Sequence, residues 1–254
     1  MSSDAVMLAL AEVPDAQQTL SMSQNVRRAV ALLGFAALVF VWNHEAKIWR
    51  GNRFYVAGMF VVLTMAPVAG WVGRRLLQKP AGVERIRWIT LFVHYTVMLA
   101  MGISIIWAFK VAGLHPLYVI PFPRVVGYFL VRVTASVVIG TVLTLALRGL
   151  GAPFAIALSR RLATDWLYRY TRNPMFVSLI AFFIAAGLWL QSTLLLLWAV
   201  FALIPAELSV LKLYEERELE LRFGDDYVAY KRKTPMLLGR RRRESRAAAA
   251  TSGQ

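Results

Sequence analysis

Six long apolar stretches, separated by shorter polar and basic segments, set the pattern of this chain. They cover approximately residues 29–42, 54–72, 86–109, 125–147, 175–190 and 193–213. A helix that crosses a bilayer needs about 20 mostly apolar residues, and runs of this kind are typical of transmembrane helices. We therefore predict an all-α, polytopic membrane protein with about six spans.

The last two stretches predict a helical hairpin that turns at Gln191-Ser192. The fifth stretch is short for a bilayer, so we expect this hairpin to be tilted or partly buried in protein. Four regions are expected along the chain: a mobile or interfacial arm (1–24), four transmembrane helices (25–148), the hairpin with a cytoplasmic amphipathic helix after it (149–238), and a basic disordered tail (239–254).

Basic residues favour one side of this predicted bundle. If both termini are cytoplasmic, 23 of the 29 lysines and arginines fall in cytoplasmic segments. The outer loops hold five, which are Lys47, Arg50, Arg53, Lys110 and Arg124. Because positive residues concentrate on the cytoplasmic side of membrane proteins, we predict cytoplasmic termini, in the inner (plasma) membrane of a bacterium. The loop from Lys47 to Arg53 fits this rule least well, so five spans remain an alternative.

The composition limits the partners and cofactors. A net charge of +15 in a soluble protein would suggest nucleic acid. Here the basic residues sit at the ends of apolar stretches, which suits anionic lipid head groups, and we expect membrane lipids and no nucleic acid as partners. The chain has no cysteine, and its three histidines (His44, His94 and His115) lie far apart, so no metal site is predicted. The oligomeric state is not indicated.

Arg132, His94 and Glu207 lie inside the predicted membrane helices, where charge is costly. Arg132 is expected to extend its guanidinium toward the interface. His94 is expected to be an interhelical hydrogen-bond partner rather than a catalytic base. Glu207, near the inner end of the sixth helix, could be either a structural partner or a polar wall of a pocket.

An amphipathic helix is predicted after the sixth stretch. Its apolar stripe at helical spacing contains Leu208, Leu211, Leu219 and Phe223. Glu215 falls on this stripe, where a carboxylate at the membrane boundary could bind a cation, and Glu216 follows it. Glu218 and Glu220 are interpreted as a solvated acidic face. Gly224 is expected to end the helix.

The segment Y-R-Y-T-R-N-P-M-F, residues 168–176, stands directly before the fifth stretch. Pro174 disfavours helical geometry at Asn173 and can begin the next helix. Exposed amides there, together with Arg169 and Arg172, could bind an anionic group. Anchoring of a basic, aromatic segment at head-group depth is the alternative.

These two blocks together resemble a known family. The stretch from 149 to 176, with G-L-G-A-P-F, R-R-L-A-T-D and Y-R-Y-T-R-N-P-M-F, is similar to the entry of the final hairpin in the isoprenylcysteine carboxyl methyltransferase and phospholipid methyltransferase group. The block E-E-R-E-L-E-L-R-F-G-D-D-Y-V-A-Y-K-R-K-T-P, residues 215–235, resembles the family's C-terminal signature. The similarity covers about residues 145–238.

The resemblance implies an integral membrane methyltransferase that uses S-adenosylmethionine, with 149–238 as its catalytic region. It implies a cofactor site formed by Leu162, Ala163, Tyr168, Asn173, Pro174, Met175 and Phe176, with Glu215 or Glu216 at the cofactor's cationic end. Arg172 is our candidate for the cofactor carboxylate, because an arginine suits a carboxylate ligand. Glu207, Glu215 or Glu216 could take a proton from an amine acceptor.

The chain departs from the family pattern at several positions. Asn173 replaces the usual histidine, so a proton-transfer role there would be lost, and Phe176 replaces the usual tyrosine. Leu211 lies about where the prenylcysteine enzymes place an arginine that meets the acceptor, which makes a prenylcysteine substrate less expected.

The implied acceptor is a lipophilic molecule, with a phospholipid amine first and a small hydrophobic carboxylate or thiol next. Two alternatives belong to other classes. One is a noncatalytic lipid-binding or assembly protein that keeps the fold. The other is a membrane reductase of the sterol type, against which the pair Glu215-Glu216 argues.

Overall fold

A computed structural model describes residues 14–47, 54–78, 82–114, 119–147, 162, 164 and 166–237. The described residues form helices and contain no strand, only an isolated bridge between Val119 and Ser192. The elements in chain order are α2 (Pro14–Lys47), α3 (Phe54–Leu63), α4 (Met65–Leu77), α5 (Val83–Leu114), α6 (Arg124–Leu147), η2 (Trp166–Arg169), α7 (Pro174–Trp189), α8 (Thr193–Trp198), η3 (Ala199–Leu203), α9 (Ile204–Val210), η4 (Leu211–Glu215) and α10 (Glu216–Lys233). The all-α prediction is confirmed.

Within the residues that the structure describes, five helical segments are long and apolar enough to cross a membrane. They are Gln24–Lys47, Phe54–Leu77, Val83–Gly113, Arg124–Thr144 and Thr193–Lys233. The sixth predicted span corresponds to α7, an apolar helix of 16 residues. At 1.5 Å per residue α7 is about 24 Å long, shorter than a hydrocarbon core of about 30 Å. The described residues therefore indicate an integral membrane protein with five candidate spans and one shorter apolar helix.

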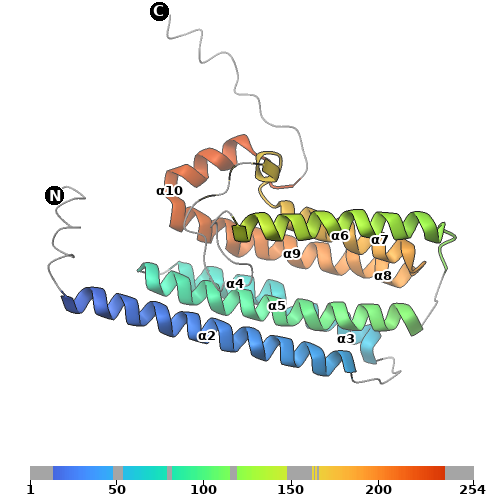
Figure 1. The fold of residues 1–254 in the computed structure, drawn as a ribbon, viewed down its shortest axis with the longest axis horizontal. Helices are drawn as coiled ribbons and strands as arrows, with labels where there is room; N and C mark the ends of the chain where they lie inside the picture. The colour runs from blue at the N-terminus through green and yellow to red at the C-terminus, as the bar shows by residue number, and fades with distance from the viewer. Residues whose placement is uncertain are drawn as a thin grey trace, which may run out of the picture.

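The helices run side by side along the long axis of the molecule (Figure 1). The last helix continues without a gap from α8 to α10, and α10 extends beyond the bundle at one end, where α4 ends and α5 begins. The turn between α7 and α8 lies at the opposite end. The long bundle therefore presents α10 and the segment before α7 together at one end.

The second predicted span is divided into α3 and α4 at Thr64. Pro67 explains the break, because proline lacks the amide hydrogen and its ring clashes with the carbonyl four residues earlier, here that of Leu63. The Thr64 hydroxyl and amide both donate to the carbonyl of Val61, at 2.6 and 3.0 Å.

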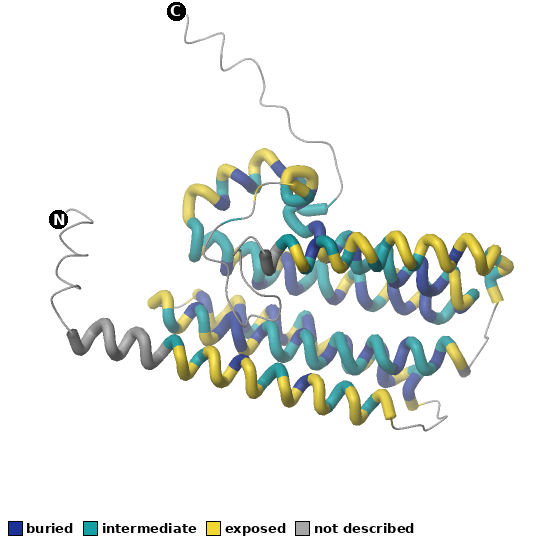
Figure 2. Tube along the Cα trace, viewed as in Figure 1, coloured by how far each residue is buried: buried dark blue, intermediate teal, exposed yellow. Residues whose placement is uncertain are grey.

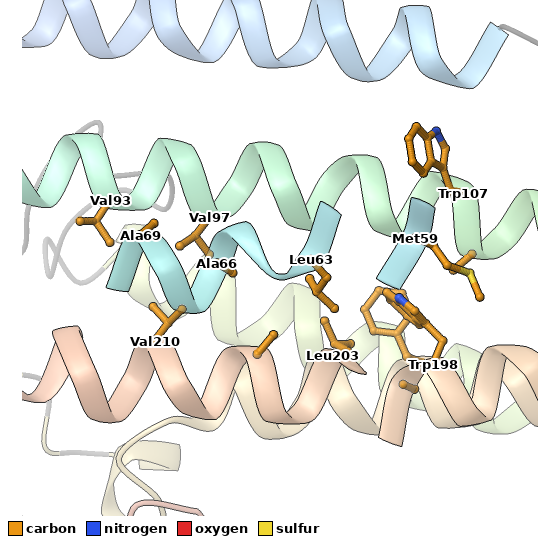
Figure 3. Close-up of a cluster of buried hydrophobic side chains, with 14 of the residues drawn as sticks. Met59, Leu63, Ala66, Ala69, Val93, Val97, Trp107, Trp198, Leu203 and Val210 are labelled. Carbon is orange, nitrogen blue, oxygen red and sulfur yellow. The ribbon is translucent and has the colours of Figure 1, made fainter. Parts of the chain in front are cut away.

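The main hydrophobic core lies between the helices α3, α4 and α5 and the last long helix. Figure 3 shows Met59, Leu63 and Ala66 facing Trp198, Leu203 and Val210, with α5 covering them from the other side. Outside this core, α2 and α6 are largely exposed along their length (Figure 2). Apolar side chains on these exposed faces suit contact with lipid tails.

The hairpin turn between α7 and α8 falls where the sequence predicts it. Gln191 adopts a positive φ of 53°, and the Ser192 hydroxyl accepts a hydrogen bond from the amide of Leu195 at 3.3 Å. The Gln191 side chain also donates to the carbonyl of Phe122 at 2.9 Å. These bonds fix the hairpin against the segment that leads into α6.

Candidate functional site

The two sequence blocks that resemble the family meet in the structure. The Thr171 hydroxyl and the Asn173 side-chain amide both donate to the carbonyl of Met236, each at 3.0 Å. The backbone amide of Arg172 donates to the carbonyl of Pro235 at 2.9 Å. The chain just before α7 is therefore held by the chain just after α10, although the two are more than 60 residues apart in sequence.

An ion-pair network joins the same two segments. Arg172 Nη1 lies 2.6 Å from Glu216 Oε1, and Lys231 Nζ lies 2.6 Å from Glu216 Oε2. Arg172 also donates to the Tyr227 hydroxyl at 3.2 Å. Its Nε is buried and has no hydrogen-bond partner. The guanidinium is thus fixed in place with one buried donor still available to a ligand.

Tyr168 lies on η2 beside the last helix. Its carbonyl accepts a hydrogen bond from the Tyr230 hydroxyl at 2.7 Å. Burial raises the pKa of the Tyr168 phenol, and the nearby Glu215 carboxylate raises it further. The phenol therefore stays a neutral hydrogen-bond donor at physiological pH, close to Glu215.

The start of α7 is built as the sequence predicts. Pro174 is its first residue, and Asn173 before it is non-helical, with φ −127° and ψ 61°. Pro174 and Phe176 are buried, whereas Met175 is 42% exposed. The Asn173 side chain does not cap the helix, because its amide group is bonded to Met236 instead.

Leu162 and Ala163 are the other two residues predicted to contact the cofactor. Leu162 is half-buried. Ala163 lies outside the described residues, as do most of residues 149–161 and the tail 239–254.

Gly224 bends α10 and so brings its second half back to the site. It has φ 52° and ψ −131°, and the helix is kinked there. The predicted helix break at Gly224 is confirmed. Beyond the kink, Tyr227, Tyr230 and Lys231 reach Arg172, Tyr168 and Glu216.

Two acidic residues, Glu207 in α9 and Glu215 at the end of η4, lie on the last long helix. They interact electrostatically, and Glu215 interacts in the same way with Tyr168 and His94. Glu207 Oε1 is buried with no hydrogen-bond partner. Among the described side chains, no lysine or arginine forms an ion pair with either carboxylate. The cluster therefore has acidic groups without a matching basic side chain.

The last long helix is not a regular α-helix around these two residues. η3 and η4 are π-helical segments, each five residues long, and Glu207 lies between them while Glu215 ends the second. A π segment adds a residue to a turn and so rotates everything that follows, and such segments often occur at functional sites.

Because of this rotation, the predicted apolar stripe is wrong beyond Leu211. The buried face continues through Tyr214 and Glu218, whereas Leu219 is only half-buried. Glu218 is 3% exposed, so its interpretation as part of a solvated face is wrong. Its carboxylate pairs with Arg222 at 2.7 Å and accepts a hydrogen bond from Thr90 on α5 at 3.4 Å. Glu220 is half-buried and pairs with Lys231 at 3.1 Å.

The predictions for His94 and Arg132 compare differently with the structure. His94 Nδ1 bonds the carbonyl of Thr90 on its own helix at 2.9 Å, so the expected interhelical hydrogen bond is wrong. Arg132 is exposed, and its guanidinium donates to the Tyr128 hydroxyl, one turn nearer the helix start, at 3.3 Å. This is the arrangement expected of an arginine that extends toward the interface.

Sequence reasoning missed several residues that build the site. They are Thr90, Thr171, Tyr214, Tyr227, Tyr230 and Lys231. Only Tyr227 and Tyr230 carry a sequence signal, since a spacing of three residues puts both on one helix face. The contacts of Thr171 and Thr90 join segments distant in sequence, which no local pattern reveals.

The arrangement suits a small ligand that carries both signs of charge. Glu207 and Glu215 supply acidic side chains that form no ion pair with a described lysine or arginine, and Arg172 offers an unused donor for an anion. Tyr168, Tyr227 and Tyr230 add aromatic surface that can contact a cation. Among the described residues, no group of three or more histidine or acidic side chains could hold a metal ion.

Comparison with known proteins identifies a family for part of the chain. A family model described as "Phospholipid methyltransferase" matches residues 122–226, which run from just before α6 into α10. This range contains the hairpin, the segment before α7 and both acidic residues of the cluster. No curated protein and no solved structure matches the chain.

Proposed function

We propose that this chain, whose residues 122–226 match the phospholipid methyltransferase family, transfers a methyl group from S-adenosylmethionine to a lipophilic acceptor. The observation that carries this proposal is the meeting of the segment before α7 with the end of α10, beside two carboxylates that lack a basic partner. These are the two blocks in which the family resemblance lies.

The acidic and basic side chains of the site match the charged groups of S-adenosylmethionine in kind. S-adenosylmethionine carries a sulfonium, an ammonium and a carboxylate. We propose that Arg172 receives the carboxylate through its unused Nε, and that Glu215 with Glu207 faces the cationic part. Glu216 is already bound to Arg172 and Lys231, so its proposed contribution is to hold the guanidinium in position.

The remaining contacts are proposed from the resemblance and from position. Leu162, Ala163, Tyr168, Asn173, Pro174, Met175 and Phe176 would line the cofactor site. The bound cofactor would supply an electrophilic methyl group. The protein's part is to align the acceptor with that group and to exclude water, for which no metal is required.

The site's place in the bundle sets the routes of access. It lies at the end of the bundle where α4 ends and α5 begins. Arg74 and Arg75 are in the last turn of α4 and Arg85 is near the start of α5, and we propose that this side is cytoplasmic. A water-soluble cofactor would enter from that side, and a lipophilic acceptor would arrive laterally from the bilayer. A phospholipid amine is the first proposed acceptor, and a small hydrophobic carboxylate or thiol is the second.

Transfer of a labelled methyl group tests this proposal. The protein would be reconstituted in vesicles of phosphatidylethanolamine and phosphatidylglycerol, and in vesicles of phosphatidylglycerol alone, with methyl-labelled S-adenosylmethionine. We expect labelled lipid only where the amine lipid is present. Label in a carboxylate or thiol of an added lipid extract would instead select the second acceptor class. Cofactor binding without transfer to any of them would favour a noncatalytic lipid-binding protein.

A further inference from the structure

We propose that the first part of α6 binds the phosphate of an anionic phospholipid, through Arg132 and Tyr128, with Arg124 as a second positive charge. The site lies at the end of the bundle that holds the turn between α7 and α8, opposite the candidate functional site (Figure 1). It does not depend on the proposed function, because none of its residues belongs to the proposed cofactor site.

The three residues of this lipid site lie at successive turns on one side of α6. Arg124, Tyr128 and Arg132 are each four residues apart, which places them on one helix face at intervals of about 6 Å along the axis. All three are exposed. Their neighbours Phe129 and Val133 are 63% and 60% exposed. The face therefore presents two arginines beside apolar side chains that suit lipid tails.

The Arg132 side chain points toward the start of α6. Its Nη1 donates to the Tyr128 hydroxyl at 3.3 Å, and its guanidinium carbon lies 5.7 Å from the centre of the Tyr128 ring. A guanidinium has five N–H donors, and among the described residues the Arg132 side chain makes no other hydrogen bond. The remaining donors suit a phosphate, which accepts several hydrogen bonds from one arginine.

Aromatic side chains place this part of α6 at the boundary of the membrane. The rings of Tyr128 and Trp189 lie 6.1 Å apart, and Trp189 is 38% exposed at the end of α7. Tryptophan and tyrosine concentrate at the depth of the lipid head groups, where the phosphates also lie. Because Arg132 extends toward Tyr128, its guanidinium reaches this depth.

The charge on this face favours a ligand with net negative charge. Within the ranges that the structure describes, neither Arg124 nor Arg132 forms an ion pair with an acidic side chain. Arg124 Nε donates instead to the side-chain oxygen of Gln191 at 3.3 Å. Arg132 belongs to a candidate span, where an arginine is costly unless it is paired. A phosphodiester would supply the missing charge.

A second copy of this chain fits the face less well than a lipid. Contacts within homodimers are mostly two-fold symmetric, so α6 packed on α6 would bring the two copies of Arg132 together. Among the described residues, the acidic side chain at this end of the bundle is Glu45, near the end of α2. Glu45 already accepts a hydrogen bond from Trp107 at 2.9 Å. Charge complementarity therefore selects an anionic phospholipid, whose acyl chains would lie along the apolar part of α6.

Quenching by brominated lipids tests this site. The chain has no cysteine, so a fluorophore attached to Phe129→Cys reports on the lipid beside the arginines. The labelled protein would be placed in phosphatidylcholine vesicles that contain increasing amounts of brominated phosphatidylglycerol or brominated phosphatidylcholine. We expect phosphatidylglycerol to associate roughly fivefold more strongly, the effect of about one arginine at an anionic surface. Arg132→Gln should remove this preference.

Arg75→Gln is the matched control for the loss of one positive charge. Arg75 is also exposed and lies over an aromatic ring, 5.1 Å from the centre of Trp71, but at the other end of the bundle. This variant should keep the preference for phosphatidylglycerol at Phe129→Cys. Millimolar inorganic phosphate should not displace the brominated lipid. Displacement would show a site for the free ion and overturn the assignment to a phospholipid.

Two further results would overturn the proposal. One is equal association of both brominated lipids with labelled Phe129→Cys, a comparison that needs no arginine variant to fold, or an unchanged preference in a folded Arg132→Gln protein. The other is weak quenching by both lipids together with disulfide cross-linking of unlabelled Phe129→Cys between chains, which would show that a second copy covers this face.

Discussion

Arg172 Nη1 and Glu216 Oε1 lie 2.6 Å apart and join the segment before α7 to the start of α10. Both side chains are largely buried, at 9% and 18% exposed. This contact holds together the two parts of the chain that are proposed to enclose the cofactor.

The contribution of this ion pair is measurable by a double-mutant cycle. Glu216→Gln leaves the buried Arg172 guanidinium without an ion-pair partner, and Arg172→Gln leaves Glu216 paired with Lys231 alone. Each variant should therefore lower the free energy of unfolding in detergent. The double variant should lose less than the sum, with a coupling of about 1–2 kcal/mol. Strictly additive losses would show that the two side chains act independently.

A second prediction concerns the close packing of α6 on α7 at Gly127. A Cβ there would lie 2.7 Å from the Cα of Trp189, a backbone atom that cannot move away cheaply. We expect Gly127→Ala to destabilise the protein by about 1–3 kcal/mol, as overpacking does. Gly140→Ala on the same helix is the control, because its Cβ would make only an ordinary contact, 3.9 Å from Trp166. Thermal unfolding of both variants tests this prediction. If Gly127→Ala and Gly140→Ala are equally stable, the close α6–α7 contact at Gly127 is contradicted.

A third prediction concerns the kink in α10. Gly224 has φ 52°, which side-chain-bearing residues rarely adopt, while its Cβ position is open. Gly224→Ala should therefore cost about 1–2 kcal/mol through backbone strain alone, and should weaken S-adenosylmethionine binding because Tyr227, Tyr230 and Lys231 follow the kink. Gly113→Ala is the control, since Gly113 lies in α5 with open space around it. A Gly224→Ala protein that is as stable as the wild type and binds S-adenosylmethionine equally well would show that the kink is not needed.

A fourth prediction concerns the orientation in the membrane. The chain has no cysteine, so single cysteines report cleanly on each side. With cytoplasmic termini, a membrane-impermeant thiol reagent added to intact cells should label Val119→Cys, which follows α5, and leave Gln78→Cys, which follows α4, unlabelled until the membrane is opened. Both positions are exposed. The reverse labelling would invert the proposed topology and place the site outside.

The sequence predicted those features that depend on local pattern. The apolar runs, the start of α7 at Pro174, the turn at Gln191 and the break at Gly224 follow from chain-local rules of length, proline and glycine geometry. Each needs no knowledge of distant contacts, which explains why these predictions agree with the structure.

The errors arose where tertiary packing changes a helical pattern. The prediction for Glu218 assumed a regular α-helix from Leu208 onward, but η4 rotates the residues after it and buries Glu218 against Thr90. His94 was expected to bond another helix, yet its partner is the Thr90 carbonyl on α5. A π segment and a buried interhelical network leave no periodic signal in the sequence.

Calorimetry of S-adenosylmethionine with the detergent-purified protein tests the central claim most directly. The wild type should bind saturably, and Glu215→Gln should weaken binding by roughly tenfold, the order of one lost charge interaction. Glu220→Gln, which removes a half-buried carboxylate of the same helix outside the cluster, should bind like the wild type. No binding by the folded wild type, with and without added lipid, would contradict the account.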